Sequence, residues 1–342
     1  MPLLQNSHLF FAYFLPKSNK ITLERKKEND MISSNVSFLE GKRLAFASNR
    51  EFTSSREGLE RAMGEDVILE GIATVCRGDM SLEVDLCGIK GIIPKDESAY
   101  YASGGNIKDI AVITRVGKAV CFKVIDVYTN ENGKTEALLS RRAAQLECLK
   151  SYLFDLIPGD IIPARITHME HFGAFADVGC GIVSLMPIDA ISVSRISHPR
   201  DRFTLGQTVN AVVRSVDYEN GRLYLTHREL LGTWEENAAH FSSGQTVSGI
   251  VRSIEDYGIF VELAPNLAGL AEYSDSVKVG DHVSVYIKSM IPEKMKIKLV
   301  LIDTYTDAVP EQNLKYYVNN AEHISIWRYS PPGSGRVIES VF

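Results

Sequence analysis

HFGAFADV at residues 171–178 and DYGIFVEL at residues 256–263 are two versions of one sequence pattern. Each places an aromatic residue, a glycine, a small or apolar residue and a phenylalanine in the same order. Each also follows an apolar stretch that opens with glycine, GDIIPARI at residues 159–166 and GQTVSGIV at residues 244–251. Repetition of this kind indicates that the chain is built from copies of one structural unit.

The remainder of each copy predicts three further strands. Short segments of β-type sequence continue both copies, with turn residues such as Asn220-Gly221 between them. Short strands separated by glycine, asparagine and aspartate are typical of a small closed barrel. The predicted strands are 182–188, 210–217 and 222–226 in one copy and 267–273, 283–291 and 296–300 in the other.

A first and weaker copy precedes these two. Ile92-Ile93-Pro94 aligns with Leu185-Met186-Pro187, which supports a common origin. Its predicted strands are 65–72, 81–86, 89–94, 119–128 and 135–140. The place of the aromatic pair is taken by Asp79 or Met80 and by Leu82 or Glu83. Because none of these residues is aromatic, the first copy lacks the aromatic pair of the other two, and we interpret it as a docking or structural module.

The expected fold is all-β, with three consecutive five-stranded barrels of the oligonucleotide-binding type joined by short helical linkers. The predicted barrels span 65–147, 159–231 and 244–303, between extensions at 1–64 and 304–342. Apolar residues at helical spacing mark the linkers at 141–156 and 229–241. Linkers this short predict a string of barrels with limited flexing.

The two extensions differ in kind. Residues 33–64 are either an RNA- or ribosome-contacting arm or a flexible solvated leader, and their basic residues are Lys42, Arg43, Arg50, Arg56 and Arg61. Residues 1–30, before Met31, are expected to be an upstream extension. The C-terminal stretch alternates like a hairpin over 314–318 and 324–329. We expect it to fold back on the third barrel, with Trp327 and Tyr329 as packing residues.

Composition restricts the class of protein. The 342 residues carry a net charge of −6, with 45% hydrophobic and 23% charged residues, as in ordinary globular proteins. No stretch approaches the ~20 apolar residues that cross a bilayer. The apolar run at 9–15 ends at Pro16 and is followed, not preceded, by cationic residues. We therefore expect a cytoplasmic location and no export. The odd, irregularly spaced set of five cysteines predicts reduced thiols.

Residues 159–303 resemble tandem S1 RNA-binding domains, and the chain resembles the ribosomal protein S1 homologues of clostridia-like bacteria. The resemblance rests on FGAF at 172–175 with Asp177, YGIFVEL at 257–263 and NLAGL at 266–270. It implies a barrel whose second and third strands bind single-stranded RNA. The family pattern assigns base stacking to Phe172, Phe175, Tyr257 and Phe260, and RNA contacts to the basic residues Arg222 and Lys296. The family's third-strand histidine is absent here, because Pro187 and Glu272 occupy that position.

Stacking also suits this chain on physical grounds. A base that stacks on an exposed aromatic ring contributes about 1–3 kcal/mol whatever its identity, and this needs no strongly basic surface. Residues three apart on a regular strand point to opposite faces. We therefore expect Gly173 and Gly258 to allow a bulge that turns both rings of each pair outward.

A basic loop joins the third and fourth strands of the middle copy at residues 191–203. Its arginines are Arg195, Arg200 and Arg202. The loop either contacts phosphates or is a solvated loop in which Arg200, Asp201 and Arg202 partly neutralise one another. The sequence does not separate these two interpretations.

No motif indicates catalysis, a cofactor or a metal site. His168 and His171 lie near Cys180, but three residues apart on a strand they would point to opposite faces. Gly104-Gly105 lacks the lysine and hydroxyl residue of a phosphate-binding loop. Asp177 and Glu262 are interpreted as strand surface, not as an acid–base pair. The protein is therefore not expected to be an enzyme.

The leading hypothesis is a monomeric protein that binds single-stranded messenger RNA in translation. In it the middle and third barrels hold the RNA, while the first barrel and the basic arm contact the 30S ribosomal subunit. The alternative is an RNA-binding regulator or adaptor of RNA decay or transcription outside the ribosome. A third hypothesis is a protein-interaction scaffold, suggested by the acidic charge and the missing third-strand histidines.

Overall fold

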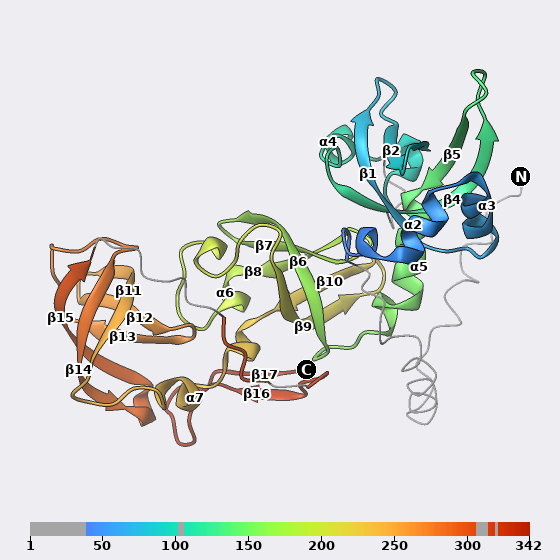
Figure 1. Cartoon of the computed structure of the whole chain (residues 1–342). Helices are drawn as coiled ribbons and strands as arrows, with labels where there is room; N and C mark the ends of the chain where they lie inside the picture. Colours follow the sequence, from blue (N-terminus) through green and yellow to red (C-terminus); the bar gives the residue numbers. More distant parts are fainter. Residues whose placement is uncertain (1–38, 102–105, 306–313, 319–320) are drawn as a thin grey trace, which may run out of the picture. The chain divides into compact units, whose positions relative to one another are not determined.

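The computed structural model describes residues 39–101, 106–305, 314–318 and 321–342 (Figure 1). Within this part of the chain the strands form three closed five-stranded barrels, which follow one another along the sequence. In each barrel the neighbours run first, second, third, fifth and fourth, and the fourth strand pairs again with the first. The predicted all-β fold of repeated five-stranded barrels is confirmed.

The fifteen barrel strands lie close to their predicted positions. The first barrel contains β1 (Leu69–Cys76), β2 (Leu82–Leu86), β3 (Ile89–Ile93), β4 (Ala119–Thr129) and β5 (Thr135–Ser140). The middle barrel contains β6 (Ile161–Glu170), β7 (Gly173–Gly179), β8 (Ile182–Pro187), β9 (Thr208–Asp217) and β10 (Arg222–Thr226). The third barrel contains β11 (Thr246–Glu255), β12 (Gly258–Ala264), β13 (Leu267–Ala271), β14 (His282–Ile291) and β15 (Lys296–Tyr305).

Alternation of side chains explains why these segments form barrels. In β12, Ile259 and Val261 are fully buried while Phe260 between them is half-buried on the outer surface. In β15, Ile297 and Leu299 point inward and Lys298 is exposed. Fully burying one such aliphatic side chain contributes about 1.5–3 kcal/mol. The period of two therefore gives each barrel an apolar interior and leaves a separate outer face for other contacts.

The linkers are helical, as predicted. Helix α5 (Arg141–Ser151) begins at Ser140, whose side chain accepts a hydrogen bond from the Ala143 N–H at 2.8 Å. It adds Cys148 and Leu149 to the core cluster of the middle barrel. The second linker is shorter and consists of the 3-10 turn η6 (Arg228–Leu231) and helix α7 (Trp234–Ala238), whose Trp234 is buried. No helix in the described ranges is long and apolar enough to cross a membrane.

The prediction of a flexible leader up to residue 64 is wrong for its last part. Helices α2 (Ala47–Thr53) and α3 (Arg56–Gly64) pack on the first barrel, and Leu59 and Ala62 are buried in its core. The Asn49 side-chain amide accepts from the Glu70 N–H at 2.8 Å and donates to the Glu70 carbonyl at 3.0 Å. These contacts make the helices part of the first barrel's structure. The predictions for residues 1–38 lie outside the described residues.

The C-terminal segment differs from the predicted hairpin. Strand β16 (Ile326–Arg328) pairs with β17 (Glu339–Val341), and residues 314–318 form no strand. Trp327 and Tyr329 are buried against the third barrel's core, which confirms their packing role.

The C-terminal segment also reaches the middle barrel. There the Ile324 N–H donates to the Gly159 carbonyl at 2.8 Å. The buried His227 ring lies 3.3 Å from the Tyr316 hydroxyl through Nε2, and burial lowers the pKa of His227 to about 4. The segment therefore packs on two barrels, not on the third alone.

Candidate nucleic-acid interface

An exposed pair of aromatic rings recurs with the same geometry in two barrels. In the middle barrel the centroids of Phe172 and Phe175 are 5.9 Å apart with an interplanar angle of 90°. In the third barrel the centroids of Tyr257 and Phe260 are 6.1 Å apart at 88°. Phe172 and Tyr257 are 57% and 69% exposed, so each pair presents ring surface to solvent. This edge-to-face contact is a favourable arrangement of two rings, and it leaves faces open for a further ring.

Both rings point outward for a reason that differs from the predicted bulge at the glycine. Phe172 lies in the turn before β7, so strand alternation does not apply to it. The register shift lies in the preceding strand, between Ile166 and His168, and at the matching position of β11. Gly173 serves another purpose, because a Cβ there would lie 2.5 Å from the Met186 carbonyl oxygen. Glycine thus lets the second strand approach the third closely.

Strand pairing places all three barrels in a common register. Immediately after the register shift, the first strand faces an equivalent residue of the second strand in every barrel. These pairs are Val75 with Glu83, His168 with Phe175, and Ser253 with Phe260. Counting three residues back along the second strand gives Met80, Phe172 and Tyr257. The alternatives that the sequence left open for the first barrel are therefore resolved as Met80 and Glu83.

The first barrel differs from the other two at this position, both in the side chain it presents and in the turn before it. The Glu83 carboxylate lies 2.6 Å from the Arg77 Nε and 3.5 Å from the Lys90 Nζ, and hydrogen bonding from Arg77 lowers its pKa. Ser81 stands where the other barrels have glycine, and its N–H and hydroxyl donate to Asp79 at 3.0 and 2.7 Å. This hairpin presents a neutralised carboxylate where the other two present a phenylalanine.

The fifth strands repeat the same division. Parallel pairing of the third and fifth strands aligns Leu138, Tyr224 and Lys298. Two residues earlier on these strands stand Glu136, Arg222 and Lys296. Arg222 and Lys296 are exposed, and neither forms an ion pair in the described part of the chain. The barrels with an aromatic pair therefore carry a free cation, and the first barrel carries a carboxylate there.

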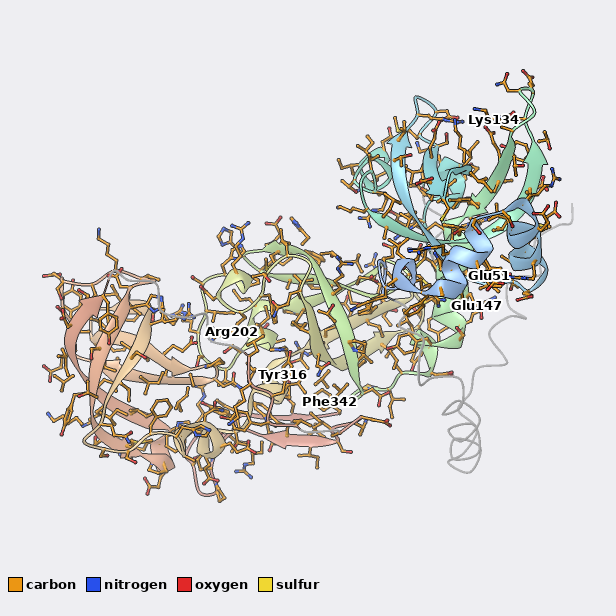
Figure 2. All side chains as sticks on the ribbon, in the orientation of Figure 1. Glu51, Lys134, Glu147, Arg202, Tyr316 and Phe342 are labelled. Carbon is orange, nitrogen blue, oxygen red and sulfur yellow. The ribbon has the colours of Figure 1, made fainter. Side chains whose placement is uncertain are left out.

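The three loop arginines differ in their exposure and in their ion pairs. Arg195 is 78% exposed, and its guanidinium lies 3.1 Å from the Glu255 carboxylate. Arg200 is exposed. The Arg202 side chain, labelled in Figure 2, is 2% exposed and lies 2.8 Å from the Glu262 carboxylate, so it is not available to RNA. Arg202 is therefore removed from the candidate set, because its charge is used inside the protein.

Asp177 and Glu262, expected on the strand surface, are buried at equivalent positions. Glu262 is paired with Arg202 and with Arg252 at 2.7 Å. Asp177 accepts a hydrogen bond from the Glu40 N–H at 2.8 Å, and burial raises the pKa of Asp177 to about 7. Both carboxylates thus belong to the packing of their barrels against neighbouring segments. The sequence could not show this, because Arg202 lies 60 residues from Glu262 and Glu40 lies 137 residues from Asp177 along the chain.

One histidine ring of the middle barrel lies next to the aromatic pair, and two others lie against each other. The ring centroids of His168 and Phe175 are 6.0 Å apart, and those of His171 and His198 are 4.9 Å apart. No group of three or more potential metal ligands is present among the described residues. Sequence reasoning also missed Tyr224 and Lys298, which share the outer face of the fifth strand with Arg222 and Lys296. Their spacing of two residues from the predicted cations was the available signal.

One family model and several known proteins are similar in sequence to this chain. Residues 155–228 match the model of the S1 RNA binding domain family. The small ribosomal subunit protein bS1 of Staphylococcus haemolyticus is 28% identical over 294 residues, which cover 84% of this chain and 69% of that protein. The bS1 protein of Leuconostoc lactis is 27% identical over 259 residues, which cover 71% of this chain and 57% of that protein.

A solved structure has also been found to resemble the chain. It is a multidomain protein with nucleic acid binding domains from Streptococcus pneumoniae, 15% identical, covering 69% of this chain with a TM-score of 0.23. The sequence relatives and the matched residues carry the assignment. Residues 155–228 thus match the S1 RNA binding domain, and most of the chain is similar in sequence to bacterial ribosomal protein bS1.

Proposed function

We propose that this protein binds single-stranded RNA in translation, as a ribosomal protein S1-like component associated with the small ribosomal subunit. The observation that carries the proposal is the repeated aromatic pair, which has the same edge-to-face geometry in the middle and third barrels and is replaced by Met80 and Glu83 in the first barrel. An exposed ring pair beside a free cation suits a nucleotide, because it can hold a base and a phosphate at once.

The binding contacts follow from this arrangement. Phe172, Phe175, Tyr257 and Phe260 would stack on bases, while Arg222 and Lys296 would contact phosphates. Each stacked base contributes about 1–3 kcal/mol, so two pairs suffice for useful affinity in spite of the acidic net charge. Stacking discriminates weakly between bases, and the predicted binding is therefore tolerant of sequence. Arg195 and Arg200 are proposed as additional phosphate contacts at the edge of the loop.

The three barrels would divide the work. The first barrel has no exposed ring pair and carries Glu83 and Glu136 at the two binding positions. A carboxylate at the cation position repels phosphate, so this barrel is not expected to hold RNA. We propose that it contacts ribosomal protein together with helices α2 and α3. The limits 65–147, 159–231 and 244–303 stay a proposal for the three barrels. Helices α2 and α3 lie before the first limit although they pack on that barrel, and β15 continues to Tyr305.

The ribosomal role is supported by the bS1 relatives, of which the chain spans 69% and 57% in the two examples above. Sedimentation of cell extract tests it, because a ribosomal role requires co-migration with the small subunit. A protein found only in the unbound fractions would instead favour a regulator or adaptor outside the ribosome. A monomeric state, a cytoplasmic location and the absence of catalysis remain predictions.

The RNA-binding site is tested by replacing Phe172, Phe175, Tyr257 and Phe260 together with alanine. We expect a loss of at least about a hundredfold in affinity for single-stranded RNA at low salt, since several stacking contacts disappear. The matched control replaces Met80 and Glu83, at the same positions of the first barrel, and should leave affinity unchanged. A folded quadruple variant with wild-type affinity would refute the site.

A further inference from the structure

The aromatic surface of the middle barrel contains a third ring. His168, on β6, has its centroid 6.0 Å from that of Phe175, and the two planes differ by 30°. Phe175 also forms the edge-to-face pair with Phe172, with the centroids 5.9 Å apart. At 6.0 Å the His168 and Phe175 rings are offset neighbours and do not cover one another, because rings in direct face-to-face contact lie about 3.5–4 Å apart. His168, Phe175 and Phe172 therefore form one group of neighbouring rings, with Phe175 next to both of the others.

The imidazole is accessible and its orientation is held. The side chain of His168 is 61% exposed. Its Nε2 lies 2.6 Å from the Glu170 Oε1, two residues along the same side of β6. A ring that is fixed at one edge loses little conformational entropy when a base settles on it. The Glu170 carboxylate therefore acts as a positioning group for the His168 ring.

The third barrel supplies an internal control for this position. Its residue in the register of His168 is Ser253, which faces Phe260. Ser253 has no ring, although Tyr257 and Phe260 reproduce the neighbouring pair. The two barrels thus share two aromatic positions and differ at the third. On the other neighbouring strand, β8, the residue that faces Phe175 is Leu185, which has no ring, so the third ring of the middle barrel comes from the first strand.

We propose that His168 is a third base-stacking ring, which makes the RNA platform of the middle barrel one nucleotide longer than that of the third barrel. The inference rests on the proposed RNA-binding function and adds a residue to it. Its ligand is a base of single-stranded RNA next to the one on Phe175. Imidazole is smaller than a phenyl ring, so a contribution at the low end of the stacking range is expected.

The test uses the full chain with Tyr257→Ala and Phe260→Ala, so that the middle barrel supplies the remaining stacking contacts. Affinity for oligouridines of increasing length is measured by fluorescence anisotropy at low salt. Adding His168→Ser should reduce affinity about fivefold to tenfold. It should also bring the length at which affinity stops rising down by one nucleotide. His168→Phe, which keeps a ring but loses the bond to Glu170, should restore most of the lost affinity.

The reciprocal change tests the same idea in the third barrel. In a chain with Phe172→Ala and Phe175→Ala, the substitution Ser253→His should raise affinity and add one nucleotide to the bound length. Unchanged affinity and length after His168→Ser, or a loss with His168→Phe as large as with His168→Ser, would overturn the stacking role. Either outcome would leave the proposed RNA binding by the two aromatic pairs intact. If the quadruple alanine variant binds like the wild type, the proposed function fails and this inference fails with it.

Discussion

Arg200 and Arg202 lie two residues apart in one loop, but we expect alanine at the two positions to change different properties. Arg202→Ala should lower stability, and Arg200→Ala should lower affinity for RNA. The Arg202 guanidinium donates to Glu262 at 2.8 Å, to the Ser192 hydroxyl at 3.2 Å and to the Asp201 carbonyl at 3.0 Å. Its side chain is 2% exposed and that of Glu262 is fully buried. Removing one partner of such a pair costs about 3–5 kcal/mol, because the remaining charge stays buried.

Arg252 sets where in this range the Arg202→Ala variant should fall. Its Nε remains 2.7 Å from the Glu262 carboxylate, so the buried charge keeps one partner. We therefore expect a loss near the lower end, about 3 kcal/mol. For a cooperative unit of roughly 150 residues, each kcal/mol lowers Tm by about 2–4 °C, which gives a decrease of about 6–12 °C. At temperatures well below this transition, affinity for RNA should not change.

Arg200→Ala is the matched control within the same loop. Its side chain is exposed and forms no ion pair within the described ranges, so stability should change by no more than about 0.5 kcal/mol. Affinity for RNA should fall severalfold if Arg200 contacts phosphate. Differential scanning calorimetry and RNA titration at one salt concentration check both variants. Weakened RNA binding by Arg202→Ala with an unchanged Tm would refute the assignment of Arg202 to internal packing.

Three further predictions concern stability and salt. Since its folded pKa of about 4 lies below its unfolded pKa, neutral His227 stabilises the fold above pH ~6.5. That contribution to the free energy of unfolding, up to about 3 kcal/mol, is lost as pH falls toward 4. In urea unfolding across this pH range, the free energy of unfolding of His227→Gln should therefore fall less than that of the wild type. Gly173→Ala should lower Tm, because its Cβ would lie 2.5 Å from the Met186 carbonyl oxygen, whereas Gly78→Ala, with no atom within 4 Å, should not. Replacing Arg222 and Lys296 with glutamine should flatten the plot of log affinity against log salt by about 1.4, at ~0.7 per phosphate contact, and an unchanged slope would exclude both contacts.

Local sequence patterns predicted the barrel strands well, because each strand carries its own alternation and turn signals. Strands β5 and β10 begin and end at the predicted residues. Helices α2 and α3 were missed because only Leu59 and Ala62 supply a buried apolar stripe on α3, and the abundant charged residues suggested a solvated leader. The three-residue strand β17, which pairs with the segment around Trp327, is too short to show a period.

The candidate site was predictable where a residue acts within its own hairpin. The glycine between Phe172 and Phe175 recurs between Tyr257 and Phe260, and this repetition marked the hairpin in both barrels. The fate of Arg202 was not predictable, because its partner Glu262 lies 60 residues away and nothing in the loop indicates burial. The correspondence of Glu83 with the phenylalanines also needed strand register, since the first hairpin is one residue longer than the others.

The C-terminal segment has a practical consequence for dissecting the protein. A fragment that ends with β15 would lack Trp327 and Tyr329, which are 7% and 5% exposed in the intact chain. Water would then reach apolar side chains of the third barrel that these rings now cover, and such patches promote self-association. A fragment of the middle barrel alone would lose the backbone hydrogen bond that the Ile324 N–H donates to the Gly159 carbonyl. Recombinant fragments cut at the barrel limits are therefore expected to aggregate. Poor RNA binding by such fragments would then result from loss of the C-terminal segment, and would not show that the barrel lacks an RNA-binding site.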